Sequence, residues 1–240
     1  MNIYDNKEFF DSYRQMSRSK GGLESAGEWY VMKNLYTSFD GKTVLDLGCG
    51  YGWHCKYAAD NGAAAVTGVD GSRRMIEKAC RINSHTNITY ITESIENFDY
   101  GTDCWDVVVS NLALHYIENL DNIYTKVYKA LKKGGYFVFN IEHPVFTAGV
   151  NQQWVTDENG KNLYWPVDNY YYPGERVTDF LGYEVKKYHH TMTQIVNGLI
   201  KAGFTLTDLY ETGPAPETLD NPYMLDEMRR PMMLIVKAVK

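Results

Sequence analysis

Glycines and carboxylates of the kind that bind small charged ligands cluster early in the chain. The glycine loop, residues 48–52, reads Gly-Cys-Gly-Tyr-Gly and follows a short apolar stretch at residues 43–47. Glycines take up positive φ angles and let a backbone approach a ligand closely. Asp46 places a carboxylate two residues before the loop. Such a carboxylate repels a pyrophosphate but suits a cationic ligand, for example one with an amino-acid end and a sulfonium.

The spacing of the glycines argues against a dinucleotide as that ligand. In the dinucleotide pattern GxGxxG, the third glycine allows tight helix–strand packing around a pyrophosphate. Here the third glycine comes one residue early, at Gly52, and Trp53 occupies the expected position. A nucleotide-dependent oxidoreductase remains a minor alternative, which tight NAD(H) binding in calorimetry would favour.

A second carboxylate, Asp70, ends the next apolar stretch and is followed by Gly71 and Ser72. An acidic residue at this point accepts hydrogen bonds from ribose hydroxyls in nucleotide-binding folds. The alternative is a carboxylate that stabilises the start of the following helix through its macrodipole. The two roles are compatible, and we favour ribose binding.

Strand and helix patterns alternate around these loops. The predicted strands are residues 43–47, 64–70, 87–92, 105–110, 136–141, 205–210 and 232–239, and the predicted helices between them are residues 54–61, 72–83, 120–131 and 191–202. Near-continuous apolar strands that alternate with helices indicate an α/β fold whose parallel sheet is buried on both faces. Ligands bind such sheets at the carboxyl ends of the strands, where the glycine loop and Asp70 lie.

Two further segments interrupt this alternation. Residues 3–36 carry apolar residues at helical spacing and predict two helices, divided at residues 17–22. Residues 143–188, the insertion segment, are rich in proline and aromatic residues and are expected to lie over the carboxyl edge of the sheet. Within this segment, residues 157–161 predict a β-hairpin. The sequence predicts one domain over residues 1–240. Its parts are cap helices (1–40), a cofactor-binding core (41–142), the insertion segment (143–188) and strands and a helix that complete the sheet (189–240).

The chain resembles the class I S-adenosylmethionine-dependent methyltransferases over roughly residues 40–142, and more weakly to its C-terminus. The matching segments are residues 44–52, 68–72, 98–111 and 131–135. The resemblance implies a Rossmann-like, seven-stranded, mostly parallel sheet with helices on both faces and an antiparallel last strand beside the fifth. It also implies S-adenosylmethionine as the methyl donor and S-adenosylhomocysteine as the product.

The resemblance also implies a set of cofactor-binding residues. Gly48 and Gly50 would contact the methionine and ribose parts, Ile95 the adenine ring, and Asn111 the methionine part from below. Arg18 in the cap would pair with the cofactor's carboxylate, although an ordinary surface arginine is the alternative. The full expected set is Tyr13, Met16, Arg18, Asp46, Gly48, Cys49, Gly50, Asp70, Gly71, Ser72, Met75, Ser94, Ile95, Glu96, Asn111 and Leu112.

Methyl transfer from a sulfonium is an in-line displacement, so the protein mainly has to align donor and acceptor, and alignment can supply up to about 7–11 kcal/mol. A general base is needed only where the acceptor loses a proton. His115 and His143, near the carboxyl edge, are the candidate bases, with a pocket wall as the alternative for His115. The adjacent pair at residues 189–190 has no further metal-ligand pattern beside it, so we expect no metal.

The expected acceptor is a small organic molecule. A formal net charge of −6 disfavours a nucleic-acid partner. Residues 220–223 read Asp-Asn-Pro-Tyr, which resembles a nitrogen-methylation motif, but they lie far from the fourth strand, where that motif acts. Among 20 tyrosines, many fall in or near the insertion segment, and Trp154, Tyr164, Trp165 and Tyr171 are predicted to line the acceptor pocket. A tyrosine-rich β-ribbon packed on its neighbours is the alternative.

The remaining expectations concern compartment and assembly. The polar N-terminus, four cysteines without a CxxC pair and the lack of any long apolar run predict a cytoplasmic protein that does not bind membranes. A monomer or a homodimer is expected. The competing function is a catalytically silent S-adenosylmethionine-binding or regulatory protein.

Overall fold

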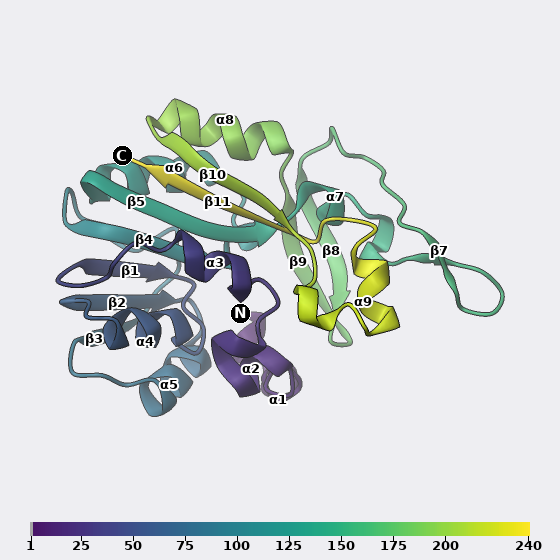
Figure 1. The fold of residues 1–240 in the computed structure, drawn as a ribbon, viewed down its shortest axis with the longest axis horizontal. Helices are drawn as coiled ribbons and strands as arrows, with labels where there is room; N and C mark the ends of the chain where they lie inside the picture. The colour runs from purple at the N-terminus through teal and green to yellow at the C-terminus, as the bar shows by residue number, and fades with distance from the viewer. Residues whose placement is uncertain (1) are drawn as a thin grey trace.

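A seven-stranded sheet forms the centre of the computed structural model, which describes residues 2–240 (Figure 1). Met1, the first residue of the predicted cap, lies outside the described residues. The strands of the sheet are β1 (Thr43–Leu47), β2 (Ala65–Asp70), β3 (Ile88–Thr92), β4 (Trp105–Asn111), β5 (Leu131–Glu142), β10 (Thr205–Thr212) and β11 (Met233–Val239). Each begins and ends close to the bounds that the apolar stretches predict, except that β5 begins five residues earlier.

The order of the strands is β10-β11-β5-β4-β1-β2-β3. Strands β1 to β5 pair in parallel, and β11 runs antiparallel to both β5 and β10. This confirms the predicted mostly parallel sheet with its last strand antiparallel beside the fifth. Because β1 and β4 are neighbours and their connections leave in opposite directions, the carboxyl ends of β1, β2 and β4 border one crevice.

Helices cover both faces of the sheet and create two separate cores. Helices α6 (Leu120–Ala130) and α8 (Met192–Ala202) pack on one face, and α3 (Trp29–Leu35), α4 (Trp53–Asp60) and α5 (Arg73–Ile82) pack on the other. Successive side chains of a strand point to opposite faces. On β4, Val108 therefore joins the core under α6, whereas Val107 and Val109 join the core under α4.

Local signals fix the ends of these helices. The Thr191 hydroxyl accepts from the Gln194 N–H, and the Gln194 side chain accepts from the Thr191 N–H, which forms a capping box at the start of α8. Gly203, with φ of 108°, ends the same helix. At the start of α5, the Ser72 side chain accepts a hydrogen bond from the N–H of Met75 and so caps that helix. The predicted helices at 191–202 and 72–83 agree with the structure to within one residue at each end.

The N-terminal segment differs from its prediction of two helices. It forms η1 (Ile3–Asp5), α1 (Lys7–Tyr13), α2 (Ser17–Gly21), η2 (Gly22–Ser25) and α3. The predicted division at residues 17–22 is wrong, because α2 occupies most of it. A single helical turn has little intrinsic stability, and α2 is instead anchored by the ion pair that Arg18 makes with Glu28. In Figure 1, α1 and α2 lie at the end of the sheet that faces β8 and β9.

The insertion segment contains two β-ribbons. Its elements are α7 (Pro144–Thr147), η4 (Val150–Gln152), β6 (Val155–Thr156), β7 (Asn162–Tyr164), β8 (Gly174–Phe180) and β9 (Tyr183–His189). The predicted hairpin is confirmed, since β6 and β7 pair antiparallel around residues 157–161. It projects away from the sheet in Figure 1. The longer ribbon of β8 and β9 was predicted only as an alternative, a tyrosine-rich β-ribbon without bounds, because its turn at Leu181-Gly182 lacks the Asn-Gly or Asp-Gly signal.

The remaining short helices are η3 (Leu114–Tyr116), η5 (Pro216–Thr218) and α9 (Pro222–Glu227). Within residues 2–240, no helix combines the length and the apolar character that a bilayer span requires.

Candidate functional site

A cavity of about 870 Å³ lies at the carboxyl ends of β1, β2 and β4. Its walls come from the glycine loop, the loops that follow β2, β3 and β4, the N-terminal helices and the ribbon of β8 and β9. The volume falls in the range of sites that hold small molecules and cofactors. The fold thus places one cavity where α/β sheets bind their ligands.

The glycine loop forms the floor of this cavity. Gly48 has φ of 73°, and a Cβ atom at this position would lie 2.2 Å from the Cβ of Ala113. Glycine is therefore required here both by backbone conformation and by the close approach of the segment after β4. The N–H groups of Gly48 and Cys49 donate to the carbonyl of Val69, at 2.8 Å and 2.9 Å, and tie the loop to the end of β2.

Asp70 at the end of β2 faces the cavity and braces the glycine loop. One carboxylate oxygen accepts from the N–H of Gly50 at 2.9 Å, and the other accepts from the N–H of Ser72 at 2.8 Å. Burial raises the pKa of Asp70 to about 6, and these two hydrogen bonds moderate the rise. Because a carboxylate oxygen has more than one lone pair, both oxygens can accept further hydrogen bonds.

Two expected cofactor-binding residues lie outside the cavity lining. The Asp46 side chain is buried on the face of the sheet that packs on α4, where its carboxylate accepts from the Cys55 thiol at 3.2 Å. Alternation along β1 directs it there, together with Val44. Ser72 is fully buried, and its hydroxyl donates to Asp5 as it caps α5. The structure therefore does not bring the Asp46 carboxylate to the cavity as expected.

The other predicted cofactor-binding residues line the cavity together. They are Tyr13, Met16, Arg18, Gly48, Cys49, Gly50, Asp70, Gly71, Met75, Ser94, Ile95, Glu96, Asn111 and Leu112. Leu112 has φ of 53°, which is uncommon for a residue with a side chain, and its N–H donates to the carbonyl of Asn140 at 2.8 Å. Such local strain is typical of functional sites.

A buried ion pair joins the N-terminal helices to β4. The guanidinium of Arg18 donates to both carboxylate oxygens of Glu28, at 3.1 Å and 2.9 Å, and the amide of Asn111 donates to Glu28 at 2.9 Å. Burial opposes ionisation of Glu28, but attraction to Arg18 and the hydrogen bond from Asn111 bring its pKa below the ordinary value. Glu28 was not among the predicted site residues, because its only signal is a lone carboxylate among apolar and aromatic residues.

Three polar side chains with little exposure line another part of the cavity. They are His115 in η3, Glu142 at the end of β5 and Lys187 in β9. The Lys187 ammonium donates to the Glu142 carboxylate at 2.5 Å, and the His115 Nε2 atom lies 3.9 Å from the same oxygen. His115 was predicted, but Glu142 and Lys187 were not, because they are distant in sequence and come together only through the ribbon.

His143 does not reach the cavity. Its Nδ1 atom accepts from the N–H of Val145 at 3.0 Å and so caps α7. Its Nε2 atom lies 2.8 Å from a carboxylate oxygen of Glu211. Both ring nitrogens therefore face other groups of the fold, and the structure does not place this histidine where a base would act.

The four aromatic residues predicted for the acceptor pocket lie elsewhere. Trp165 stacks on Phe146 with ring centroids 5.3 Å apart, contacts Trp154, and receives the Arg230 guanidinium 4.3 Å above its ring. Tyr164 and Tyr171 are exposed, at 57% and 86%. The prediction fails because the tryptophans pack around Arg230, whereas the ribbon of β8 and β9 supplies the cavity wall.

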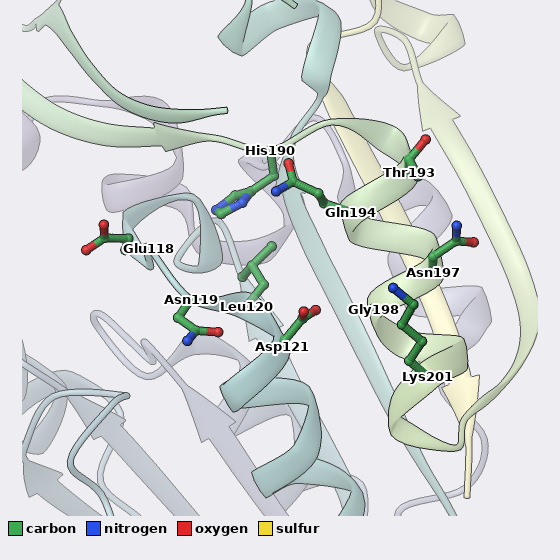
Figure 2. A pocket seen from close by; sticks show the side chains of 10 residues that line it. All are labelled: Glu118, Asn119, Leu120, Asp121, His190, Thr193, Gln194, Asn197, Gly198 and Lys201. Carbon is green, nitrogen blue, oxygen red and sulfur yellow. The ribbon is translucent and has the colours of Figure 1, made fainter. Parts of the chain in front are cut away.

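A second, polar cavity of about 480 Å³ lies between the start of α6 and α8, away from the glycine loop (Figure 2). His190, Gln194, Asn197 and Lys201 line it from the side of α8, and residues 118–121 line it from the side of α6. None of the predicted site residues takes part. Within residues 2–240, no group of three or more histidine, cysteine, aspartate or glutamate side chains is arranged to hold a metal ion.

The strand order, the antiparallel strand beside β5 and the cavity over a glycine loop together define the Rossmann-like methyltransferase fold. Comparison with known proteins agrees. A family model described as a methyltransferase domain matches residues 45–139. An uncharacterized protein of Haemophilus influenzae is 29% identical over 251 residues, which cover 100% of this chain and 97% of that protein.

Two solved structures are similar over nearly their whole length. A protein of Listeria monocytogenes, described as a candidate S-adenosylmethionine dependent methyltransferase, is 49% identical, with a TM-score of 0.87 and coverage of 91% of this chain and 99% of that chain. An S-adenosylmethionine dependent methyltransferase of Mesorhizobium loti is 36% identical, with a TM-score of 0.84 and coverage of 91% and 100%. The chain belongs to the S-adenosylmethionine-dependent methyltransferases, and S-adenosylmethionine is its cofactor.

Proposed function

We propose that this enzyme transfers the methyl group of S-adenosylmethionine to a small organic acceptor by in-line displacement within the 870 Å³ cavity. The observation that carries the proposal is that a single cavity joins the glycine loop and Asp70 at one end to His115, Glu142 and Lys187 at the other. One end suits the cofactor, and the other offers polar groups that the cofactor does not need.

The residues at the first end fit the cofactor. A Cβ at Gly50 would have nothing within 4 Å, so the loop backbone is open there, and Asp70 has lone pairs free to accept from ribose hydroxyls. In this proposal Ile95, with Ser94 and Glu96, borders the adenine ring. Asn111 and Leu112 lie beneath the methionine part. Arg18 approaches the cofactor's carboxylate while both of its terminal nitrogens contact Glu28.

The protein's main contribution to the reaction is orientation. Bound cofactor supplies a methyl group already activated by its sulfonium. The floor of glycines and the cap of N-terminal helices fix the direction of that group, and the Tyr4 hydroxyl bonds the Tyr116 hydroxyl at 3.0 Å where the cap meets the loop after β4. Exclusion of water and alignment of the acceptor lone pair are effects worth several kcal/mol.

The size and surroundings of the cavity favour a small acceptor over a polymer. The N-terminal helices and the ribbon of β8 and β9 both line it, and Asp179 and Glu184 are among its lining residues. With a net charge of −6 these features disfavour a phosphate backbone as partner.

Incubation with S-adenosylmethionine and a fractionated metabolite extract tests this proposal. The expected result is formation of S-adenosylhomocysteine in some fractions, with a product heavier by one methylene group in mass spectrometry. The Asp70→Ala variant serves as the matched control and should form much less. Tight S-adenosylhomocysteine binding without turnover in any fraction would instead support a regulatory protein.

A further inference from the structure

A buried carboxylate, Glu28, joins the N-terminal helices to strand β4. Its side chain is 1% exposed, at the residue that precedes α3. Arg18 of α2 donates to both of its oxygens, at 3.1 Å and 2.9 Å, and the amide of Asn111, at the end of β4, donates to one of them at 2.9 Å. Arg18 and Asn111 line the cavity, whereas Glu28 lies behind them. Three N–H donors of two cavity residues therefore converge on one buried group.

A further hydrogen bond fixes the orientation of the Asn111 amide. Its oxygen accepts from the amide of Asn140 on β5 at 2.9 Å, while its nitrogen faces Glu28. An ionised carboxylate can only accept hydrogen bonds, so the nitrogen of Asn111 has to point to Glu28. The carboxylate thus determines which end of this amide lies where, at a residue that lines the cavity.

The guanidinium of Arg18 keeps donors for a second partner. It carries five N–H groups in a planar fork, and two of them bond Glu28. Because Glu28 occupies the edge between the two terminal nitrogens, the edge that Nε forms with one terminal nitrogen stays open. The Nε atom has no partner within residues 2–240 and is not enclosed by protein. Such an edge fits another carboxylate with two parallel hydrogen bonds.

The charges of this group match the amino-acid end of the cofactor. Burial opposes ionisation of Glu28, but attraction to Arg18 and the hydrogen bond from Asn111 bring its pKa below the ordinary value. The pair of Glu28 and Arg18 is therefore neutral as a whole. The amino-acid end of S-adenosylmethionine has one ammonium and one carboxylate and is also neutral as a whole. Its entry adds no net charge to a largely buried site, which limits the electrostatic cost of binding.

We propose that Glu28 makes the site specific for the amino-acid end of the cofactor. It holds Arg18 with the open edge of its fork available to the cofactor's carboxylate, and it directs the amide of Asn111 at the same part of the cavity. This inference rests on the proposed placement of the methionine part beside Arg18 and Asn111. Glu28 acts through these two residues and is a positioning residue.

The opposite role for Glu28 is competition with the cofactor for Arg18. Removal of the carboxylate would then free the guanidinium and strengthen binding. The geometry favours positioning, because Glu28 bonds the terminal edge of the fork and leaves the Nε edge open. A long side chain that is already held in place also loses less conformational entropy when a ligand binds.

Two ligands that differ in the group on sulfur separate this role from a general effect on the fold. S-adenosylhomocysteine carries the amino-acid end, and methylthioadenosine has a methyl group in its place. In Glu28→Gln, affinity for S-adenosylhomocysteine should fall at least tenfold, the size expected for hydrogen bonds to a charged group. Affinity for methylthioadenosine should change less than about threefold. Isothermal titration calorimetry measures both.

Glu24→Gln is the matched control. Glu24 is an exposed glutamate of η2 that accepts from the Trp29 side chain at 3.0 Å, and it does not contact Arg18 or Asn111. A glutamine oxygen can accept the same hydrogen bond. Both affinities should therefore stay nearly unchanged in this variant.

A double variant leaves no ion of the pair without its partner. Arg18→Met with Glu28→Gln removes both charges, so the cost of an unpaired buried charge does not arise. Because the fork is gone, the double variant should show the same selective loss of S-adenosylhomocysteine binding. Because Glu28 acts largely through Arg18, the loss should be smaller than the product of the losses in Arg18→Met and Glu28→Gln.

Amide hydrogen exchange provides a second readout. S-adenosylhomocysteine should slow exchange in α1 and α2 more than methylthioadenosine does, because its amino-acid end adds a contact to Arg18 of α2. Glu28→Gln should remove this difference between the two ligands.

Two results would overturn the proposal. An equal loss of affinity for both ligands in Glu28→Gln would mean that Glu28 supports only the fold. Tighter binding of S-adenosylhomocysteine would mean that Glu28 competes for Arg18. All of these measurements use binding and need no acceptor. A failure to find methyl transfer therefore leaves this inference intact, and its own failure leaves the proposed methyl transfer intact.

Discussion

Two aspartates on neighbouring strands, the buried Asp46 and the partly exposed Asp70, differ in what surrounds them. Asp70 accepts two backbone N–H groups and faces the cavity, whereas Asp46 accepts only the Cys55 thiol, and its other oxygen has no partner in the described chain. Burial raises the pKa of both, to about 6 for Asp70 and about 7 for Asp46. The environment of each carboxylate therefore indicates different roles and different consequences of removal.

Replacement of Asp70 tests the cofactor end of the cavity. Asp70→Ala removes the acceptor for ribose hydroxyls and the brace on Gly50, so binding of S-adenosylhomocysteine should weaken at least tenfold, or about 1.4 kcal/mol. Isothermal titration calorimetry measures it, and circular dichroism checks the fold. Asp60→Ala, which removes an exposed carboxylate that pairs with Lys56, is the control. Unchanged affinity for Asp70→Ala would refute the ribose role.

Replacement of Asp46 tests a pH dependence of stability. The pKa of Asp46 rises from 3.8 to about 7 mainly through burial, against the hydrogen bond from Cys55. The folded state then binds more protons than the unfolded state between these values, so this group's contribution improves as pH falls from 7 to 4 and is least favourable above 7. Asp46→Asn should raise the free energy of unfolding at pH 8 by up to about 4 kcal/mol and change it little at pH 4.

Urea unfolding at pH 8 and pH 4 measures this difference. Glu77→Gln, at an exposed carboxylate on α5, is the control and should show no comparable pH dependence. Equal effects of Asp46→Asn at the two pH values would mean that the surroundings of Asp46 do not raise its pKa.

At the scale of elements, the glycine loop depends on two close approaches. A Cβ at Gly48 would meet Ala113, and a Cβ at Gly52 would lie 2.2 Å from the Tyr90 hydroxyl. The loop is therefore packed between the segment after β4 and the side chain of β3. The conformation that opens its backbone to a ligand is fixed by neighbours on both sides.

Alanine at Gly48 should destabilise the protein more than alanine at another left-handed glycine. Gly41 has φ of 68° and open space around its Cβ position. Gly41→Ala therefore loses only the free energy of holding alanine in a left-handed conformation, about 1–2 kcal/mol. Gly48→Ala adds a clash with Ala113 and should cost at least about 1 kcal/mol more. Thermal unfolding of both variants compares them, and equal losses would show that the segment after β4 moves away freely.

Sequence patterns predict the sheet well because each strand carries its own local signal. The run from Thr43 to Leu47, ended by glycines, and the run ended by Asp70 identify two strands and their ligand-facing ends without any tertiary information. The ribbon of β8 and β9 has no such signal, since Leu181 occupies a turn position where asparagine or glycine is typical. Because the ribbon could not be predicted, the contact between Lys187 and Glu142 could not be predicted from the sequence either.

At the scale of the whole molecule, Arg230 connects the insertion segment to the C-terminal part of the chain. Its contacts with Phe146, Trp154 and Trp165 are called the clasp below. Its guanidinium lies 4.9 Å from the Phe146 ring and 4.3 Å from the Trp165 ring, and it pairs with Glu227. Cation–π contacts with desolvated arginine contribute up to about 2 kcal/mol each. Trp154 and Trp165, two of the four aromatic residues that the sequence assigned to the acceptor, instead lie against Arg230.

Arg230→Ala should loosen the insertion segment locally. Amide hydrogen exchange should become faster in residues 150–167, while exchange in β1 to β5 stays slow and S-adenosylhomocysteine affinity changes less than threefold. Arg81→Ala, on the exposed side of α5, is the matched control. Faster exchange throughout the sheet would show instead that the clasp supports the whole fold.

The position of β11 between β5 and β10 has a consequence for biosynthesis. While the chain is being made, β5 pairs with β4 on one side, but its other edge has no partner until residues 233–239 have left the ribosome. An unpaired apolar strand edge invites association with other chains. Met232 and Met233 also line the cavity, so a nascent chain that lacks them has neither a partner for this edge of β5 nor a complete cavity lining. Emergence of this strand therefore covers the free edge of β5 and completes the lining of the cavity.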